Sequence, residues 1–107
     1  MELPGRLVLL GHPVEHSLSP VFQNAALRAA GIPLTYEAID VPSDGLVRMA
    51  HLLADVGAAG NVTVPHKEAF AACCSTLSPV ASRVGAVNTF WTEDGVLVGD
   101  NTDRKST

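Results

Sequence analysis

The stretch from Asn61 to Lys67, Asn-Val-Thr-Val-Pro-His-Lys, carries most of the residues that could do chemistry. Asn61 and Thr63 alternate with valines, as polar positions on one face of a short strand do. Lys67 falls in the first turn of the helix predicted after Pro65, where a cation opposes the helix dipole at a cost of about 0.3–1 kcal/mol. We interpret the three polar residues as hydrogen-bonding groups for a small polyhydroxylated ligand. The alternative for Lys67 is a solvated lysine.

Two further motifs have both a structural and a functional interpretation. Ser17-Leu18-Ser19 precedes a predicted helix, and Ser19 followed by Pro20 is typical of a helix N-cap. Hydroxyls beside a helix N-terminus can also hold a carboxylate, and the two roles can coexist. Asn88 falls inside a predicted strand, where asparagine is disfavoured. It either binds a ligand hydroxyl beyond the strand or is an edge residue satisfied by backbone.

Asn101-Thr102-Asp103 consists of residues that commonly form turns and helix caps. The carboxylate of Asp103 would form a proton-handling pair with Lys67 only if the fold brings the two together. His12, Glu15 and His16 lie close in sequence, but Pro13 excludes a helical pair and no third ligand follows at suitable spacing. We therefore predict no metal site.

The predicted elements alternate between strand and helix. Strands are expected at 6–11, 35–40, 60–64, 86–91 and 96–98, and helices at 19–30, 43–56 and 65–74, with a short helix after Ser78-Pro79. This order predicts an α/β fold, a three-layer α/β/α arrangement with a mixed, mainly parallel sheet of about six strands. The Asp94-Gly95 hairpin signal supplies the antiparallel neighbour. Ligands of such sheets bind outside the carboxyl ends of the strands.

Apolar residues at helical spacing predict which side of each helix faces the sheet. In the first helix they are Leu18, Phe22, Ala25, Ala26 and Ala29, and in the second Leu46, Met49, Ala50 and Leu53. Ser43 is expected to cap the second helix.

Composition excludes several classes of protein. The chain has 107 residues, 47% of them hydrophobic and 17% charged, which is typical of one folded domain. A net charge of −4 without a basic cluster argues against nucleic-acid or acidic-membrane binding. We find no signal peptide and no membrane-spanning stretch. The adjacent Cys73 and Cys74 are expected to be small buried residues of a reducing compartment, so we expect a cytoplasmic protein.

Four motifs, taken in order, resemble shikimate dehydrogenase: Gly11 to Pro20, Gly60 to Glu68, Gly85 to Thr89, and Gly99 to Asp103. They span nearly the whole chain and correspond to the N-terminal, substrate-binding domain of that family. The resemblance places this domain at 1–103 and leaves 104–107 as a tail.

The resemblance implies an NADP-dependent oxidoreductase that interconverts 3-dehydroshikimate and shikimate in aromatic amino-acid biosynthesis. It also implies roles for particular residues: Ser17 and Ser19 hold the substrate carboxylate. Hydroxyls are bound by Asn61, Thr63, Asn88 and Asp103. Lys67 and Asp103 form the catalytic pair, with Lys67 as general acid or base.

The chain departs from the family pattern after Asp103. The family's NADP-binding Rossmann domain is absent from this chain, which has no Gly-x-Gly-x-x-Gly fingerprint. We therefore expect substrate binding without turnover. One alternative is a non-enzymatic binding or regulatory module for a shikimate-like ligand. Another is an assembly domain that uses exposed strand residues such as Trp91, and we expect some self-association into a homo-oligomer.

Overall fold

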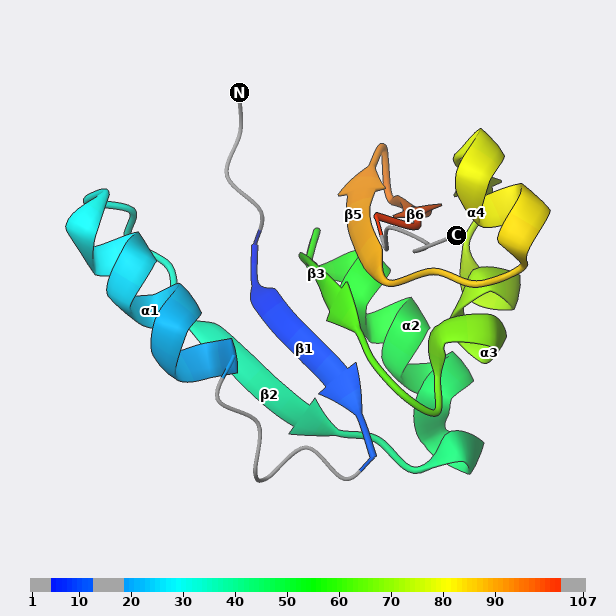
Figure 1. The fold of residues 1–107 in the computed structure, drawn as a ribbon, viewed down its shortest axis with the longest axis horizontal. Coiled ribbons are helices and arrows are strands. Elements are labelled where there is room, and N and C mark those ends of the chain that lie inside the picture. Colours follow the sequence, from blue (N-terminus) through cyan, green and yellow to red (C-terminus); the bar gives the residue numbers. More distant parts are fainter. Residues whose placement is uncertain (1–4, 13–18, 103–107) are drawn as a thin grey trace, which may run out of the picture.

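The fold is built on one six-stranded sheet, which the computed structural model describes together with its helices over residues 5–12 and 19–102 (Figure 1). The strands are β1 (Leu7–Gly11), β2 (Tyr36–Asp40), β3 (Ala59–Val62), β4 (Thr76–Leu77), β5 (Thr89–Glu93) and β6 (Val96–Asp100). Their order is β2-β1-β3-β5-β6-β4. Of these strands, β5 alone runs antiparallel to its neighbours. The predicted α/β class with a mixed, mainly parallel sheet is confirmed.

Five helical segments connect the strands. They are α1 (Ser19–Ala29), the 3₁₀ turn η1 (Ser43–Gly45), α2 (Leu46–Asp55), α3 (Lys67–Cys73) and α4 (Pro79–Val84). Figure 1 shows α1 beside β2 at one end of the sheet, and α2 and α3 together at the other side of the central strands. Over the part of the chain that is described, no helix combines the length and apolar character that crossing a bilayer requires.

The main core lies between the sheet and helices α2, α3 and α4. Val8 and Leu10 of β1 are fully buried in it. The rings of Phe70 in α3 and Phe90 in β5 lie 4.9 Å apart and are both buried. The predicted stripe of α2 is confirmed, because its Leu46, Ala50 and Leu53 are buried and Met49 packs against them.

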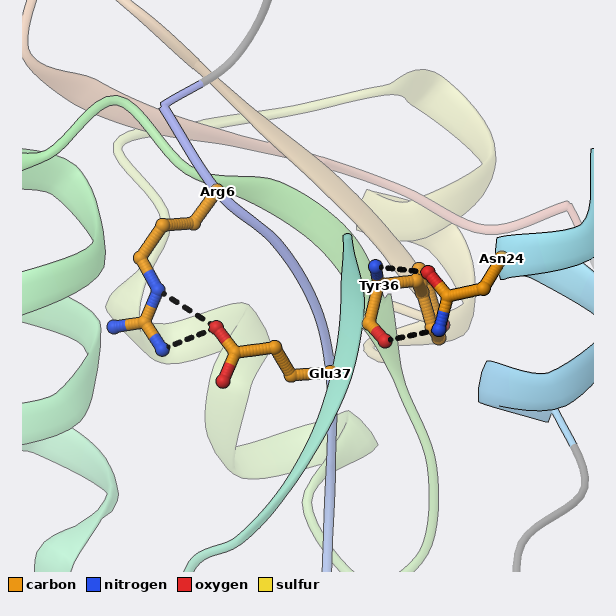
Figure 2. Close-up of polar contacts among 4 residues, drawn as sticks. All are labelled: Arg6, Asn24, Tyr36 and Glu37. Atoms are coloured by element: carbon orange, nitrogen blue, oxygen red, sulfur yellow. Dashed lines mark hydrogen bonds and ion pairs between the residues drawn. The ribbon is translucent and has the colours of Figure 1, made fainter. Parts of the chain in front are cut away.

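The described alanines of the apolar pattern predicted for α1 do not face the sheet: Ala25, Ala26 and Ala29 are exposed, whereas Asn24 is half-buried. Leu18 and the side chain of Phe22, which belong to the same predicted pattern, lie outside the described residues. Two hydrogen bonds hold Asn24 to the edge strand: the Asn24 amide donates to the backbone oxygen of Tyr36 at 3.0 Å, and the Tyr36 backbone N–H donates to the Asn24 oxygen at 2.6 Å. Figure 2 shows this pair beside the ion pair of Arg6 with Glu37. Hydrogen bonding therefore holds the side of α1 that carries Asn24 against β2.

Turn residues predict several element ends correctly. Ser78 caps α4 by accepting the backbone N–H of Ala81 at 3.1 Å, and Gly85 ends that helix at φ 77°. Asp94 and Gly95 have φ values of 52° and 79°, as a two-residue hairpin turn requires. Phe90 is buried and Trp91 is 36% exposed, so these neighbours lie on opposite faces of β5. Assembly through Trp91 stays a prediction.

Three local predictions are wrong. Ser43 begins η1 rather than capping α2, whose N-cap is Gly45. Asn88 lies just before β5, not inside the strand. Strand β4 falls in a segment predicted as loop, because two residues are too few to show a strand period and its pairing with β6 depends on the tertiary fold.

Candidate functional site

Polar residues from distant parts of the sequence meet where β1, β2, β3 and β6 end, which we call the carboxyl edge. The register aligns Asn61 of β3 with Leu9 of β1 on one side and with Thr89 of β5 on the other. Thr89 in turn pairs with Asp100 of β6. Since β5 is antiparallel, its first residue and the preceding Asn88 lie at the edge where the other strands finish.

Thr63 continues β3 past its end along β1. Its backbone N–H donates to the Leu10 oxygen at 2.8 Å, and its own backbone oxygen accepts the His66 N–H at 3.0 Å. The Thr63 side chain is half-buried. The Thr63 backbone therefore joins the end of β1 to the segment that leads into α3.

Lys67 lies in the first turn of α3, as predicted, although the helix begins at Lys67 itself and not at position 65; the residue is half-buried. Its backbone oxygen accepts the N–H of Val87 at 2.9 Å, which ties the start of α3 to the segment before β5. This bond brings Lys67 next to Asn88, which lies 21 positions later in the sequence (88 − 67). Lys67 and Asn88 carry an amine and an amide, groups that can hold an oxygen-rich ligand and, for the amine, exchange a proton with it.

Asn88 connects three segments of the carboxyl edge. Its side-chain oxygen accepts the backbone N–H of Thr102 at 2.9 Å and the hydroxyl of Thr89 at 3.0 Å. The Asn88 backbone N–H donates to the Asp100 oxygen at 3.1 Å, and its backbone oxygen accepts the Val62 N–H at 2.9 Å. The end of β6 is thereby fixed beside β3 and β5.

Asn61 is engaged by neighbouring protein groups. Its side-chain oxygen accepts the hydroxyl of Tyr36 at 2.8 Å, and its amide nitrogen donates to the Asn88 backbone oxygen at 3.3 Å and to the Thr89 hydroxyl at 3.4 Å. Asn61 thus links the predicted site residues to the buried start of β2.

Sequence reasoning did not find Tyr36 or His66. Tyr36 is 5% exposed, and His66 is 1% exposed with its Nε2 hydrogen-bonded to the Val41 backbone oxygen. That bond joins the start of α3 to the segment after β2. His66 directly precedes Lys67. Its burial, which marks it as part of this region, is visible in the structure but not in the sequence.

Three predicted site residues cannot be placed. Ser17 and Asp103 lie outside the described residues, and so does the side chain of Ser19, although its backbone begins α1.

Within the described ranges, no three His, Cys, Asp or Glu side chains gather as a metal would require. His12 Nδ1 lies 2.5 Å from an Asp40 carboxylate oxygen, which makes an exposed pair at the same edge.

The two thiols are half-buried rather than fully buried as expected. Burial raises the pKa of Cys73. Burial, and then the neighbouring Cys73, raise the pKa of Cys74 to about 11. Both side chains are therefore neutral thiols near pH 7, which is unfavourable for nucleophilic chemistry.

Tyr36 gives the fold a dependence on alkaline pH. It is the chain's one tyrosine, and burial raises its pKa from 10.0 to about 12. Below pH 10 the hydroxyl is protonated in both states, but between pH 10 and 12 only the unfolded chain releases the proton. The free energy of unfolding therefore falls through this window. We expect wild type to lose about 2–3 kcal/mol more than Tyr36→Phe.

Urea unfolding of both proteins at several pH values measures this difference. Absorbance of the tyrosinate ion reports the same group directly in the folded protein. A titration midpoint near pH 10.0, the ordinary value, would contradict the buried, protonated state of Tyr36.

The sheet, with polar side chains from several segments at its carboxyl edge, defines an α/β domain of the kind that binds a small ligand there. The family model for the shikimate dehydrogenase substrate binding domain matches residues 9–90. The chain belongs to this family.

Known relatives agree in both sequence and structure. The NADP(+)-dependent shikimate dehydrogenase of Moorella thermoacetica is 52% identical over 100 residues, covering 92% of this chain and 34% of the relative. Shikimate 5-dehydrogenase from Thermus thermophilus, solved in complex with shikimate, has a TM-score of 0.86 and 42% identity, covering 91% of this chain and 38% of that one. The same enzyme solved with NADP(H) and shikimate matches equally well, with a TM-score of 0.86. The chain thus spans about a third of its relatives' length.

Proposed function

We propose that this chain is the substrate-binding part of an NADP-dependent shikimate dehydrogenase, which interconverts 3-dehydroshikimate and shikimate. The observation that carries the proposal is the backbone bond from Val87 to Lys67, which holds the first residue of α3 beside the segment that contains Asn88. Relatives named as NADP(+)-dependent shikimate dehydrogenases support the same reaction. Half-buried, reduced cysteines support a cytoplasmic location.

The proposed roles are those that the resemblance to the family implies, and the chemistry of each group suits its role. The carboxylate of shikimate is held by Ser17 and Ser19 near the start of α1, and its hydroxyls by Asn61, Thr63, Asn88 and Asp103. Carbonyl reduction leaves negative charge on the substrate oxygen, and the Lys67 ammonium stabilises that charge and donates the proton. In the reverse direction Lys67 accepts the proton, and Asp103 is its proposed partner.

The cofactor belongs to another part of such an enzyme. NADP(H), when bound, supplies or accepts the hydride. The 107 residues contain no Gly-x-Gly-x-x-Gly fingerprint. We therefore assign no cofactor contact to them and propose that the chain alone binds shikimate without oxidising it.

An NMR titration of the isotope-labelled chain with shikimate tests this proposal. We expect saturable shifts at Thr63, Lys67 and Asn88. The methyl ester of shikimate, which lacks the carboxylate charge, should bind more weakly.

Lys67→Met should weaken binding, whereas Lys105→Met, which removes the chain's second lysine, provides a control of equal charge. Equal affinity of both variants would count against a role for Lys67. Unchanged spectra up to millimolar shikimate would contradict binding by this chain altogether.

A further inference from the structure

Four side chains form a continuous hydrogen-bond chain across the sheet, from the buried start of β2 to the carboxyl edge. The hydroxyl of Tyr36 donates to the side-chain oxygen of Asn61 at 2.8 Å. The Asn61 amide donates to the Thr89 hydroxyl at 3.4 Å, and that hydroxyl donates to the side-chain oxygen of Asn88 at 3.0 Å. We call these four residues the relay.

The strand register explains how residues far apart in sequence connect. Leu7 and Leu9 of β1 pair with Tyr36 and Asn61 respectively, so Tyr36 reaches over β1 to the next strand. Asn61 and Thr89 are direct partners across β3 and β5. Side chains of paired residues lie on the same face of a sheet, and the relay therefore runs along one face.

Every donor in the relay points in the same direction, toward Asn88. An asparagine amide can turn over, and the surrounding hydrogen bonds decide which end is oxygen and which is nitrogen. Asn61 presents its oxygen to Tyr36 and its nitrogen both to Thr89 and to the backbone oxygen of Asn88, which leaves the Thr89 proton for the side-chain oxygen of Asn88. The backbone N–H of Thr102 reaches that same oxygen at 2.9 Å.

Tyr36 is well suited to fix the direction of the relay. Both its backbone polar groups are held by Asn24 of α1, at 3.0 and 2.6 Å, and its side chain is 5% exposed (Figure 2). Burial also keeps the hydroxyl protonated, since its pKa is raised to about 12. A phenol fixed in this way acts as a donor at one end of the relay.

We propose that Tyr36 is a positioning residue that, through Asn61 and Thr89, sets the orientation of the Asn88 side-chain amide. Asn88 then turns its oxygen toward Thr89 and Thr102 and directs one of its two N–H groups to a ligand oxygen. The site thereby recognises an oxygen that accepts a hydrogen bond, at a position that Tyr36 itself does not touch. The identity of the ligand rests on the proposed function above, whereas the relay does not.

Without the Tyr36 hydroxyl, the oxygen of Asn61 loses the donor that holds it at 2.8 Å, and only the longer bonds of its nitrogen, at 3.3 and 3.4 Å, still oppose turning over of the amide. When the amide turns over, its oxygen can accept the Thr89 proton, which removes one of the donors that hold the oxygen of Asn88. Tyr36→Phe deletes this hydroxyl and keeps the ring, so the space beside β1 stays filled.

The first test needs no ligand. Side-chain amide resonances of Asn61 and Asn88 are measured in wild type and in Tyr36→Phe. We expect both amides to shift, and the Asn88 amide to exchange faster with solvent. Thr92→Val is the matched control: it deletes a hydroxyl of β5 that donates to the Ala58 backbone oxygen at 2.7 Å, outside the relay. That variant should leave the Asn88 amide unchanged even though it loses one hydrogen bond.

The second test uses shikimate as the probe. Tyr36→Phe should weaken binding about threefold to tenfold, as expected for one misdirected hydrogen bond. Thr89→Val breaks the relay at its middle and serves if Tyr36→Phe fails to fold. The double variant should bind about as weakly as the weaker single variant, because the two residues act through one path.

An unshifted Asn88 amide in both Tyr36→Phe and Thr89→Val would overturn the relay, whatever shikimate does. So would equal losses of affinity in Tyr36→Phe and Thr92→Val, which would indicate a merely structural effect. If wild type does not bind shikimate but the Asn88 amide still shifts, the proposed function fails and the relay stands.

Discussion

Replacing Lys67 with methionine should lower kcat for shikimate oxidation by about 10²–10⁴-fold, the usual contribution of a general acid or base. The measurement requires a hydride-transferring partner, so the chain is placed in a chimera that replaces the matching third of the Moorella thermoacetica relative. Methionine keeps the approximate length of the side chain and removes the proton-carrying charge. The loss should fall mainly on kcat, because the transferred proton matters most in the transition state.

Two controls isolate the role of Lys67. Lys105→Met removes an equal charge and should leave kcat unchanged. Lys67→Ala leaves space for a small amine, and added methylamine should restore part of the rate. A Lys67→Met chimera with the kcat of the parent chimera would show that the proton is carried by another group.

Gly60→Ala should leave the chain largely unfolded. Gly60 lies in β3 between Val8 of β1 and Phe90 of β5. A Cβ atom there would meet the Val8 backbone oxygen at 1.9 Å and the Val8 backbone nitrogen at 2.9 Å. Backbone in the middle of a sheet cannot move aside as a side chain can. We expect a loss above about 4 kcal/mol, a large part of the roughly 5–15 kcal/mol that stabilises a typical domain.

Urea unfolding followed by circular dichroism measures this loss. Gly45→Ala is the matched control, since its added Cβ would have only Val41 Cγ1 nearby, at 4.0 Å, and its φ of −102° suits any residue. That variant should unfold at nearly the wild-type urea concentration. Equal midpoints for Gly60→Ala and wild type would contradict the close approach of β1 and β3.

Local sequence signals, such as helix caps and turn residues, predicted much of the fold. Ser78-Pro79 and Gly85 marked both ends of α4, and Asp94-Gly95 marked the hairpin between β5 and β6, because these residues act on their own neighbours. The alternation of strand and helix likewise predicted the mixed, mainly parallel sheet. Signals of this kind need no knowledge of partners distant in the sequence.

What could not be predicted depends on those distant partners. The hydrogen bonds that hold α1 to the edge strand join Asn24 to Tyr36, 12 positions away (36 − 24). The link between Tyr36 and Asn61 exists only because β1 lies between β2 and β3 in the sheet. Motifs in the sequence were enough to predict the residues of the site. The relay from Tyr36 to Asn88 could not be predicted, because it depends on the order of the strands in the sheet.

A crystal structure of this chain soaked with shikimate tests the central claim most directly. We predict the ring of shikimate at the carboxyl edge, with one ring oxygen substituent within hydrogen-bonding distance of both the Lys67 Nζ and the Asn88 amide nitrogen. Shikimate bound elsewhere, or a Lys67 amine directed away from the bound ring, would contradict the assignment of this edge as the substrate site.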